Sequence, residues 1–353
     1  MKIVSIVGAR PQFVKAAVLS RKISENTNWE EVMVHTGQHF DANMSAVFFE
    51  EMSIPAPQYF LGIDSLTREE MIAQMQTEIE KVLQKENPDW VLVYGDTNST
   101  LAGAKAAKAN GIKLAHVEAG LRSFDKQMPE ELNRIATDEL SDLLLVPSNK
   151  ATANLQLENI QALDNGVVEV GDIMHDALLF YLKKIQHQTI SKPKAPFVLL
   201  TLHRAANTDS KEVLTRILKA IDNITKEVEV IFPVHPRTRK KMEEWNLSTH
   251  ATLMEPVGYF QMLNYLQQAD LVLTDSGGLQ KEAFYVNKFC ITLRENTEWT
   301  ELLDLGVNVL CGSDGAKIAQ AYSNFSNRRF GEYPQVYGDG NTAEKIILAL
   351  NNF

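Results

Sequence analysis

Short apolar, β-branched runs alternate along the chain with longer stretches of helical periodicity. Near-continuous apolar strands separated by helices are typical of parallel sheets that helices cover on both faces. Two series of such runs predict an α/β protein with two doubly wound, Rossmann-like domains. The predicted strands are residues 3–7, 31–35, 90–94, 113–118, 143–147 and 167–170, then 197–201, 228–233, 251–254, 271–274, 290–293 and 307–311. The predicted helices include 11–25, 68–86, 98–109, 173–185 and 342–352.

The length of the chain, 353 residues, also favours two domains, because a single hydrophobic core rarely serves so many residues. The boundary is predicted near Gly171, since an amphipathic stretch and then the polar, linker-like segment 187–196 follow it. We expect residues 1–170 with 340–353 to form an N-terminal domain. Residues 171–339 are expected to form the C-terminal domain.

Composition excludes several classes of function. The net charge of −10 provides no basic field for nucleic acid. Cys290 and Cys311 lie in apolar, strand-like contexts, so we expect buried free thiols rather than a disulfide framework or a zinc site. The chain starts directly in a predicted strand, and no apolar run approaches the roughly 20 residues needed to cross a membrane. A cytoplasmic protein without a membrane partner is the expectation.

Charged residues follow several strands of the first series, where doubly wound domains bind their ligands. The loop 8–15 (Gly-Ala-Arg-Pro-Gln-Phe-Val-Lys) places Arg10 and Lys15 near a helix N-terminus, which favours anions. Asp96 follows the strand 90–94, Glu118 ends the strand 113–118, and Glu130 opens a helix. Asp96 and Glu130 each have an alternative role as ordinary helix-terminus residues.

Taken together, the three carboxylates Asp96, Glu118 and Glu130 are predicted to share one rim with two cations. Clustered carboxylates shift one another's pKa values and suit general acid–base chemistry. They are also potential ligands of a divalent metal, but the chain has no Asp-x-Asp pair or closely spaced His/Asp set there. We therefore expect no metal and no cofactor.

The second series predicts a binding site for a phosphorylated ligand. His203 and His235 follow two of its strands. The segment 274–283 (Thr-Asp-Ser-Gly-Gly-Leu-Gln-Lys-Glu-Ala) leads from a strand into a helix through Ser276, Gly277 and Gly278. Small residues let backbone N–H groups approach a diphosphate there. The loop lacks the Walker lysine and the Gly-x-Gly-x-x-Gly pattern, which disfavours an ATPase or an NAD enzyme.

A set of motifs in this order resembles the non-hydrolysing UDP-N-acetylglucosamine 2-epimerase family. The resemblance covers residues 1 to about 315, and again 338–340. The motifs are Gly-Ala-Arg-Pro-Gln-Phe-Val-Lys (8–15), His-Thr-Gly-Gln-His (35–39), Gly-Asp-Thr-Asn-Ser-Thr (95–100), His-Val-Glu-Ala-Gly-Leu-Arg-Ser (116–123), Pro-Glu-Glu-Leu-Asn-Arg (129–134), Leu-His-Arg (202–204), Val-His-Pro-Arg (234–237) and the segment 274–283.

This resemblance implies the glycosyltransferase-B fold, a homodimer and an active site in the cleft between the domains. It also implies the reaction: UDP-N-acetylglucosamine and UDP-N-acetylmannosamine interconvert through a bound 2-acetamidoglucal, for cell-surface polysaccharide precursors. The implied catalytic residues are Asp96, Glu118, Glu130 and His203. The implied substrate-binding residues are Arg10, Lys15, Arg134, His235, Met262, Ser276, Gly277, Gly278, Glu282 (on the ribose) and Trp299. Which carboxylate is the acid and which is the base stays open.

Departures from the common family pattern bear on the sugar. The usual Thr-Glu-Arg-Pro-Glu reads Thr-Glu-Trp-Thr-Glu at 297–301, and the usual Gln-Glu-Glu reads Gln-Lys-Glu at 280–282. With the segment 40–45, they resemble a subgroup that epimerises UDP-2,3-diacetamido-2,3-dideoxyglucuronate, which is the alternative substrate. They also leave open whether an allosteric substrate site exists.

Other functions are compatible with parts of the chain. A glycosyltransferase of the same fold would explain the second half, but it does not need three carboxylates in the first. A hydrolysing epimerase usually has Arg-Ala-Asp where this chain has Arg-Pro-Gln. A silent sugar-nucleotide sensor would not need the set Asp96, Glu118, Glu130 and His203.

Overall fold

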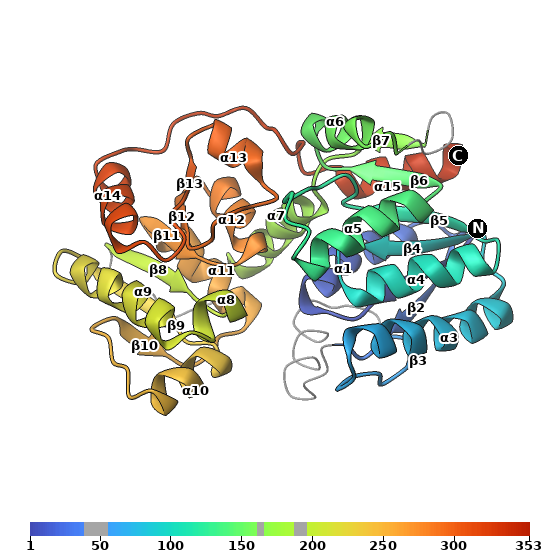
Figure 1. The fold of residues 1–353 in the computed structure, drawn as a ribbon. Coiled ribbons are helices and arrows are strands. Elements are labelled where there is room, and N and C mark those ends of the chain that lie inside the picture. Colours follow the sequence, from blue (N-terminus) through green and yellow to red (C-terminus); the bar gives the residue numbers. More distant parts are fainter. Residues whose placement is uncertain (39–55, 161–165, 187–195) are drawn as a thin grey trace. The chain divides into compact units, whose positions relative to one another are not determined.

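The computed structural model describes residues 1–38, 56–160, 166–186 and 196–353. They fold into two compact units: unit 1 is Met1–Tyr181 with Gln335–Phe353, and unit 2 is Leu182–Pro334. Each unit contains one parallel sheet, and in the described ranges helices connect most of its successive strands (Figure 1). The predicted fold class, α/β with two doubly wound sheets, is confirmed.

In unit 1, the described strands follow the order β3-β2-β1-β4-β5-β6-β7. The strands are β1 (Lys2–Val7), β2 (Glu30–His35), β3 (Tyr59–Phe60), β4 (Trp90–Tyr94), β5 (Lys113–Val117), β6 (Leu143–Val146) and β7 (Val167–Glu169). The helices are α1 (Arg10–Ser24), α3 (Arg68–Glu86), α4 (Asn98–Ala109), α5 (Pro129–Leu140), α6 (Asn149–Leu157), α7 (Ile173–Ile185), which continues into unit 2, and α15 (Thr342–Asn352).

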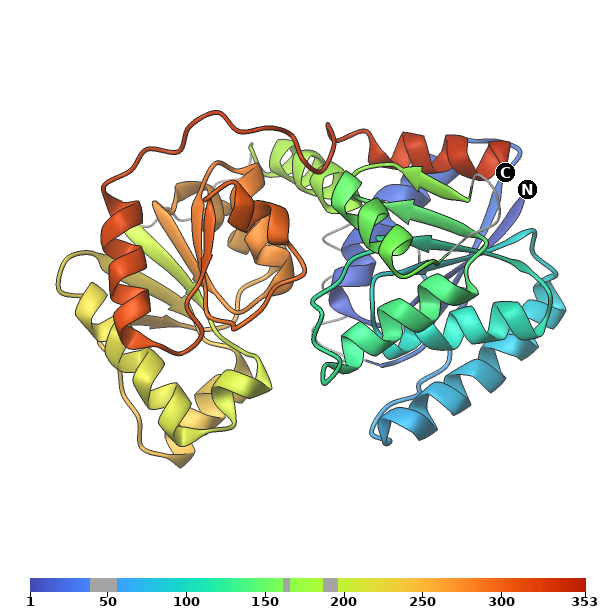
Figure 2. The same ribbon diagram turned by 45° about the horizontal axis from the view of Figure 1, so that its top comes forward.

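The core of unit 1 forms because its central strands are apolar on both faces. Val91 and Val93 of β4 pack in one cluster with Met75 of α3 and Ala102 of α4. Helix α15 also belongs to unit 1. It packs against α1, although the two helices lie at opposite ends of the sequence (Figure 2). Helix packing therefore supports the sheet whose loops carry the predicted site residues of unit 1.

In unit 2, the described strands follow the order β10-β9-β8-β11-β12-β13. The strands are β8 (Phe197–Thr201), β9 (Glu229–Pro233), β10 (Thr252–Met254), β11 (Leu271–Thr274), β12 (Phe289–Thr292) and β13 (Asn308–Leu310). The helices are α8 (Ala205–Thr208), α9 (Lys211–Ile224), α10 (Pro236–Glu244), α11 (Tyr259–Gln268), α12 (Gly277–Tyr285), α13 (Thr300–Asp304) and α14 (Gly315–Ser326).

The cysteine prediction is confirmed, because Cys290 and Cys311 are both buried free thiols. Burial raises the pKa of Cys290 to about 12 and that of Cys311 to about 11. These thiols therefore stay protonated at neutral pH. In the part of the chain that the structure describes, no helix has the length and apolar character needed to span a bilayer.

Candidate active site

The predicted site residues lie on loops and helices that follow strands of each sheet, several of them at its switch point. In unit 1, β1 lies between β2 and β4, so the loops after β1 and β4 diverge there. In unit 2, β8 lies between β9 and β11 in the same way. The point at which strand order reverses opens a crevice at the carboxyl ends of the strands, and doubly wound proteins bind ligands there.

Gln12 holds the first two loops of unit 1 together. Its Oε1 accepts hydrogen bonds from the backbone N–H groups of Gly8 (2.8 Å) and Ala9 (3.0 Å). Its Nε2 donates to the carbonyl of Tyr94 (2.8 Å) and to Thr100 Oγ1 (3.0 Å). Because both N–H donors and both acceptor positions of the side-chain amide are hydrogen-bonded inside the protein, the loops after β1 and β4 keep a fixed relative position.

Glu118 leaves the strand pattern at the end of β5. The predicted strand 113–118 ends at Val117 because Glu118 has a φ of +75°, which side chains other than glycine rarely adopt. Its carboxylate forms an ion pair with Lys15, and the two side chains are only 7% and 8% exposed. A Cβ at Gly95 would lie 3.3 Å from both Glu118 Oε2 and Lys15 Nζ, so glycine there leaves room for the pair.

Asp96 follows Gly95 and forms a second ion pair, with Arg134 of α5 at 2.5 Å. Arg134 also contacts Glu131 at 2.8 Å. Asn133 donates to the backbone carbonyl of Asp96 at 2.9 Å. The cap of α4 is Thr97. Asp96 is therefore not the helix cap, and its carboxylate, 31% exposed, is reachable by a ligand.

Glu130 lies half-buried in the first turn of α5, one turn before Arg134. Its neighbour Glu131 is buried and accepts hydrogen bonds from the N–H groups of Ser123 (2.9 Å) and Phe124 (2.8 Å). Glu131 therefore shapes the loop, while Glu130 stays nearer the surface. Arg10 begins α1, and its side chain lies outside the described residues.

His116, Asp138 and Arg122 form a buried network below the site, and the sequence assigned them no role. His116 bonds Asp138 (2.7 Å) and the carbonyl of Gly95 (2.7 Å), and Arg122 donates to Asp138 (2.8 Å). Burial opposes ionisation of Asp138, but His116 and Arg122 outweigh it and hold the pKa of Asp138 below its ordinary value. The network fixes the turn that presents Asp96. His116 and Arg122 lie inside a family motif, which was the available signal.

In unit 2, Asp275 organises the loop after β8. Its carboxylate lies 3.0 Å from His203 Nδ1 and accepts from the N–H of Arg204 (2.9 Å) and from Asn207 (3.1 Å). Burial alone would raise the pKa of Asp275, but these hydrogen bonds outweigh burial and hold the pKa below its ordinary value. A carboxylate on Nδ1 leaves the other ring nitrogen, Nε2, of His203 directed away from Asp275. The ring of His235 lies 5.7 Å away.

The N-terminus of α12 has the features of an anion site. Ser276 is its cap, and Ser276 Oγ accepts from the N–H of Leu279 (3.4 Å). Gly277 and Gly278 begin the helix, so their N–H groups are at its positive end. Glu282, one turn further, is buried and accepts from the hydroxyl of Tyr259 on α11 (2.9 Å). Sequence reasoning missed Tyr259, which lies on a separate element.

The other predicted residues of unit 2, Met262, His235 and Trp299, lie on or next to the helices α11, α10 and α13. Met262 is half-buried on α11. His235 caps α10, and its Nδ1 accepts from the N–H of Arg237 (3.2 Å). Trp299 is 4% exposed, and the ammonium of Lys281 lies 3.7 Å from the centre of its indole ring. The indole is therefore packed against α12, and its role in binding stays a prediction.

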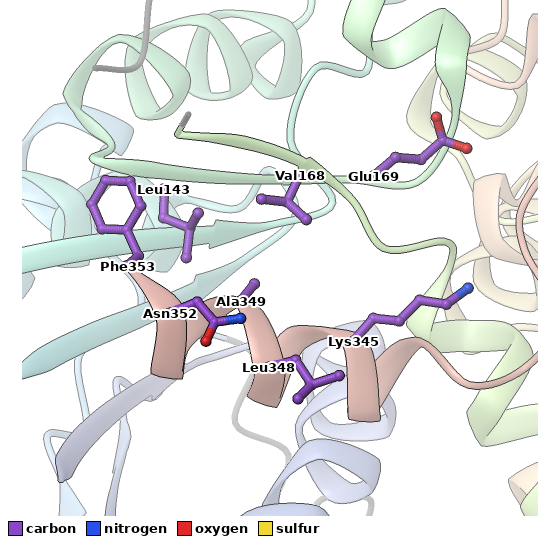
Figure 3. Close-up of a pocket in the computed structure, with 8 residues that line it drawn as sticks. All are labelled: Leu143, Val168, Glu169, Lys345, Leu348, Ala349, Asn352 and Phe353. Carbon is purple, nitrogen blue, oxygen red and sulfur yellow. The ribbon is translucent and has the colours of Figure 1, made fainter. Parts of the chain in front are cut away.

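A separate pocket of about 370 Å³ lies in unit 1, between the last helix and the edge of the sheet (Figure 3). It is lined by Leu143, Val168, Glu169, Lys345, Leu348, Ala349, Asn352 and Phe353. None of these residues is a predicted site residue. Within the described ranges, no group of three or more His, Cys, Asp and Glu side chains is arranged to hold a metal ion.

Comparisons with known proteins agree with the motifs. Residues 21–351 match the family model described as UDP-N-acetylglucosamine 2-epimerase. A UDP-2,3-diacetamido-2,3-dideoxy-D-glucuronate 2-epimerase from Pseudomonas aeruginosa is 47% identical over 99% of both chains. A UDP-N-acetylglucosamine 2-epimerase from Methanococcus maripaludis is 44% identical over 98% of this chain and 97% of its own.

Among solved structures, the UDP-GlcNAc 2-epimerase of Methanocaldococcus jannaschii in complex with UDP-GlcNAc and UDP matches all of both chains, with a TM-score of 0.93 and 41% identity. The expected fold of the glycosyltransferase-B type is thereby confirmed. The rival interpretation as a glycosyltransferase loses its support, because the relatives named above, which are 41% to 47% identical over nearly the whole chain, are named as epimerases. The chain belongs to the UDP-N-acetylglucosamine 2-epimerase family and is an isomerase of UDP-sugars.

Proposed function

We propose that the chain inverts C2 of a UDP-linked N-acetylhexosamine without hydrolysing it, and interconverts UDP-N-acetylglucosamine and UDP-N-acetylmannosamine. The observation that carries the proposal is that two ion-paired carboxylates of unit 1 meet at Gly95. Glu118 and Lys15 lie beside Gly95 in space, and Asp96, which pairs with Arg134, is the next residue in the chain. An epimerisation that removes a proton from one face and returns it to the other needs more than one such group.

In the proposed reaction, a carboxylate of unit 1 removes the proton from C2 while the bond from C1 to UDP breaks. The electron pair of the C2–H bond forms the C1–C2 double bond of 2-acetamidoglucal. A second carboxylic acid then returns a proton to the opposite face of C2, and UDP adds back to C1. Glu118, Asp96 and Glu130 are the candidates for these two roles.

Unit 2 would hold the nucleotide. Departure of UDP from C1 develops negative charge on its β-phosphate, and charge that develops in a transition state is stabilised by fixed donors and cations. The N–H groups of Gly277 and Gly278 and the ring of His203, oriented by Asp275, are the donors proposed for this role. Glu282 would accept hydrogen bonds from the ribose hydroxyls.

The test is proton NMR of the reaction in deuterated water, with each UDP-sugar offered separately. We expect the gluco C2 proton signal to disappear, deuterium to enter C2, and the manno epimer to appear with its UDP still attached. Absence of exchange at C2 with every UDP-sugar would overturn the proposal. Accumulation of free N-acetylmannosamine and UDP would instead indicate a hydrolysing enzyme.

A second candidate substrate is UDP-2,3-diacetamido-2,3-dideoxyglucuronate. It is favoured by the 47% identity to an epimerase of that name and by the departures at Lys281 and Trp299. The same carboxylates would act at C2 of this sugar. The ratio of kcat/KM for the two UDP-sugars decides between the candidates.

We also propose that the enzyme is a cytoplasmic homodimer that supplies precursors of cell-surface polysaccharides, as the family resemblance implies. A UDP-sugar is the only ligand that this proposal requires. Light scattering coupled to size-exclusion chromatography tests the dimer, since a mass near 39.6 kDa would indicate a monomer.

A further inference from the structure

The two glycines that begin α12 face different surroundings. A Cβ at Gly278 would meet no heavy atom within 4 Å. A Cβ at Gly277 would lie 2.6 Å from Glu298 Oε1 and 3.7 Å from the NH1 of Arg294. Neither glycine has a positive φ. Gly278 therefore leaves open space at the helix N-terminus. At Gly277, the absence of a side chain makes room for the carboxylate of Glu298 and the guanidinium of Arg294.

Glu298 and Arg294 form a buried ion pair at this place. Arg294 NH2 lies 2.9 Å from Glu298 Oε2, and the side chains are only 5% and 7% exposed. Both lie on the segment after β12, which is tied to α12 because Thr297 Oγ1 donates to Gln280 Oε1 at 2.8 Å. The position of the pair beside Gly277 is thus set by the same helix whose N-terminus it adjoins.

A carboxylate next to a diphosphate site creates an electrostatic conflict. The positive end of α12 favours Glu298 as it favours a phosphate. Once the phosphates bind, however, the carboxylate repels them, and in a buried site this repulsion is screened far less than in water. A cation in contact with Glu298 removes the conflict. Over the described residues, the NH1 of Arg294 is buried without a hydrogen-bond partner, so the guanidinium has a donor beyond its contact with Glu298.

We propose that Arg294 is a positioning residue of the nucleotide site: it neutralises Glu298 and so allows the N-terminus of α12 to accept a diphosphate. Glu298 fills the space beside Gly277, and Arg294 cancels its charge. This inference rests on the proposed function, because it presupposes that UDP binds at Ser276–Gly278.

The two charges predict effects of opposite sign on UDP binding. Arg294→Met leaves an uncompensated carboxylate and weakens UDP binding by about 10- to 100-fold. Glu298→Gln leaves an uncompensated guanidinium and tightens UDP binding or leaves it unchanged. Arg294→Met/Glu298→Gln returns the Kd for UDP to within about threefold of the parent. If the pair had only a structural role, both single variants would instead bind UDP more weakly than the parent.

The experiment measures the Kd of the full chain for UDP by titration calorimetry and for uridine by ligand-observed NMR. Uridine carries no phosphate, so Arg294→Met should leave its binding unchanged while UDP binding falls. Arg216→Met is the matched control, because Arg216 pairs with Glu212 at 2.8 Å on the exposed face of α9. This control makes the same change of charge and should leave both Kd values unchanged.

Thermal denaturation establishes that each variant is folded. If Arg294→Met does not fold, Arg294→Lys and Glu298→Gln still test the inference. Arg294→Lys keeps the positive charge and should bind UDP like the parent. Weaker UDP binding by both Arg294→Lys and Glu298→Gln would overturn the inference. Equal loss of UDP and uridine binding in Arg294→Met, or an unchanged Kd for UDP, would also overturn it. Failure of the parent itself to bind UDP would overturn the proposed function and this inference with it.

Discussion

Glu118 combines two features that a purely structural residue avoids. Its φ of +75° is a strained conformation for a side chain larger than glycine, and its carboxylate is almost fully buried. Strain of this kind costs on the order of 1–3 kcal/mol and persists where the surrounding structure fixes it. The carbonyl of Leu145 (3.0 Å) and the ammonium of Lys15 provide that support.

We expect Glu118→Gln to retain UDP binding but to lose at least about 100-fold in kcat, because a glutamine cannot exchange a proton with C2. Steady-state kinetics and calorimetry with UDP measure the two quantities. Glu25→Gln, which removes the carboxylate of an exposed pair with Lys22, is the control and should keep the parental rate. Turnover within a few-fold of the parent would make Glu118 a structural carboxylate.

The variant Asp275→Asn tests whether the carboxylate of Asp275 orients the ring of His203. The folded pKa of Asp275 is below its ordinary value, so the ionised carboxylate stabilises the protein above pH ~4, and this contribution disappears as pH falls below that value. We expect the variant to lose about 1–3 kcal/mol of unfolding free energy at pH 7.

The difference between Asp275→Asn and its parent should narrow as pH falls toward 3. Urea denaturation followed at several pH values provides the measurement, and kcat should fall together with stability because His203 loses its fixed orientation. A stability difference that stays constant from pH 7 to pH 3 would exclude this linkage.

At the scale of elements, Lys281 and Trp299 join α12 to the segment before α13. The ammonium lies 3.7 Å from the centre of the indole ring, and both side chains are buried. A cation over an indole is favourable, and more so without water. These two positions are also among the departures from the common family pattern, which has a glutamate and an arginine there. A cation–π contact in this chain therefore replaces a possible ion pair.

We expect Trp299→Arg to destabilise the fold by bringing two cations together, and Lys281→Glu/Trp299→Arg to restore the melting temperature. The double variant should also shift the ratio of kcat/KM from the diacetamido glucuronate toward UDP-N-acetylglucosamine, since an arginine offers five donors where the indole offers one. An unchanged ratio in a folded double variant would remove Trp299 from the specificity argument.

Several elements could be predicted from the sequence to the residue. The strands 90–94, 197–201 and 271–274 coincide with β4, β8 and β11, because each is a continuous apolar run that ends at a polar or glycine turn. The two-residue strand β3 could not be predicted, since it leaves no periodic pattern. The end of β5 at Val117 depends on the positive φ of Glu118, which residue type does not indicate.

At the scale of the whole molecule, each unit places basic side chains beside carboxylates of the candidate site. In unit 1, Lys15 and Arg134 form ion pairs with Glu118 and Asp96, and in unit 2 the ring of His203 contacts Asp275. In the proposed mechanism, side chains of this kind stabilise the charge that develops on the leaving UDP. We therefore expect epimerase activity to persist in excess EDTA, measured as the rate of C2 exchange before and after chelation. Loss of activity that added magnesium or manganese restores would contradict a mechanism carried by side chains.

Candidate site residues could be proposed from the sequence, but the contacts between them could not. Motifs supplied the candidates because each loop carries its own chemistry. The contacts between them join residues far apart in the chain: Lys15 and Glu118 are separated by 103 positions, and the N–H of His203 and Asp275 by 72. The order of the strands in each sheet brings these loops together, and this order cannot be read from any single segment of the sequence. Arg294 and Glu298 are only four positions apart, but their place beside Gly277 depends on the pairing of β11 with β12 and could not be predicted from either segment alone.

The last segment of the chain, Gln335–Phe353, belongs to unit 1, although all of unit 2 is translated before it. A nascent chain on the ribosome can therefore complete unit 2 while the surface that receives Ile346 and Leu350 of α15 is still uncovered. Uncovered apolar surface is what chaperones bind and what promotes aggregation. The unit that carries the proposed acid–base residues can therefore be completed only after residues 335–353 have left the ribosome.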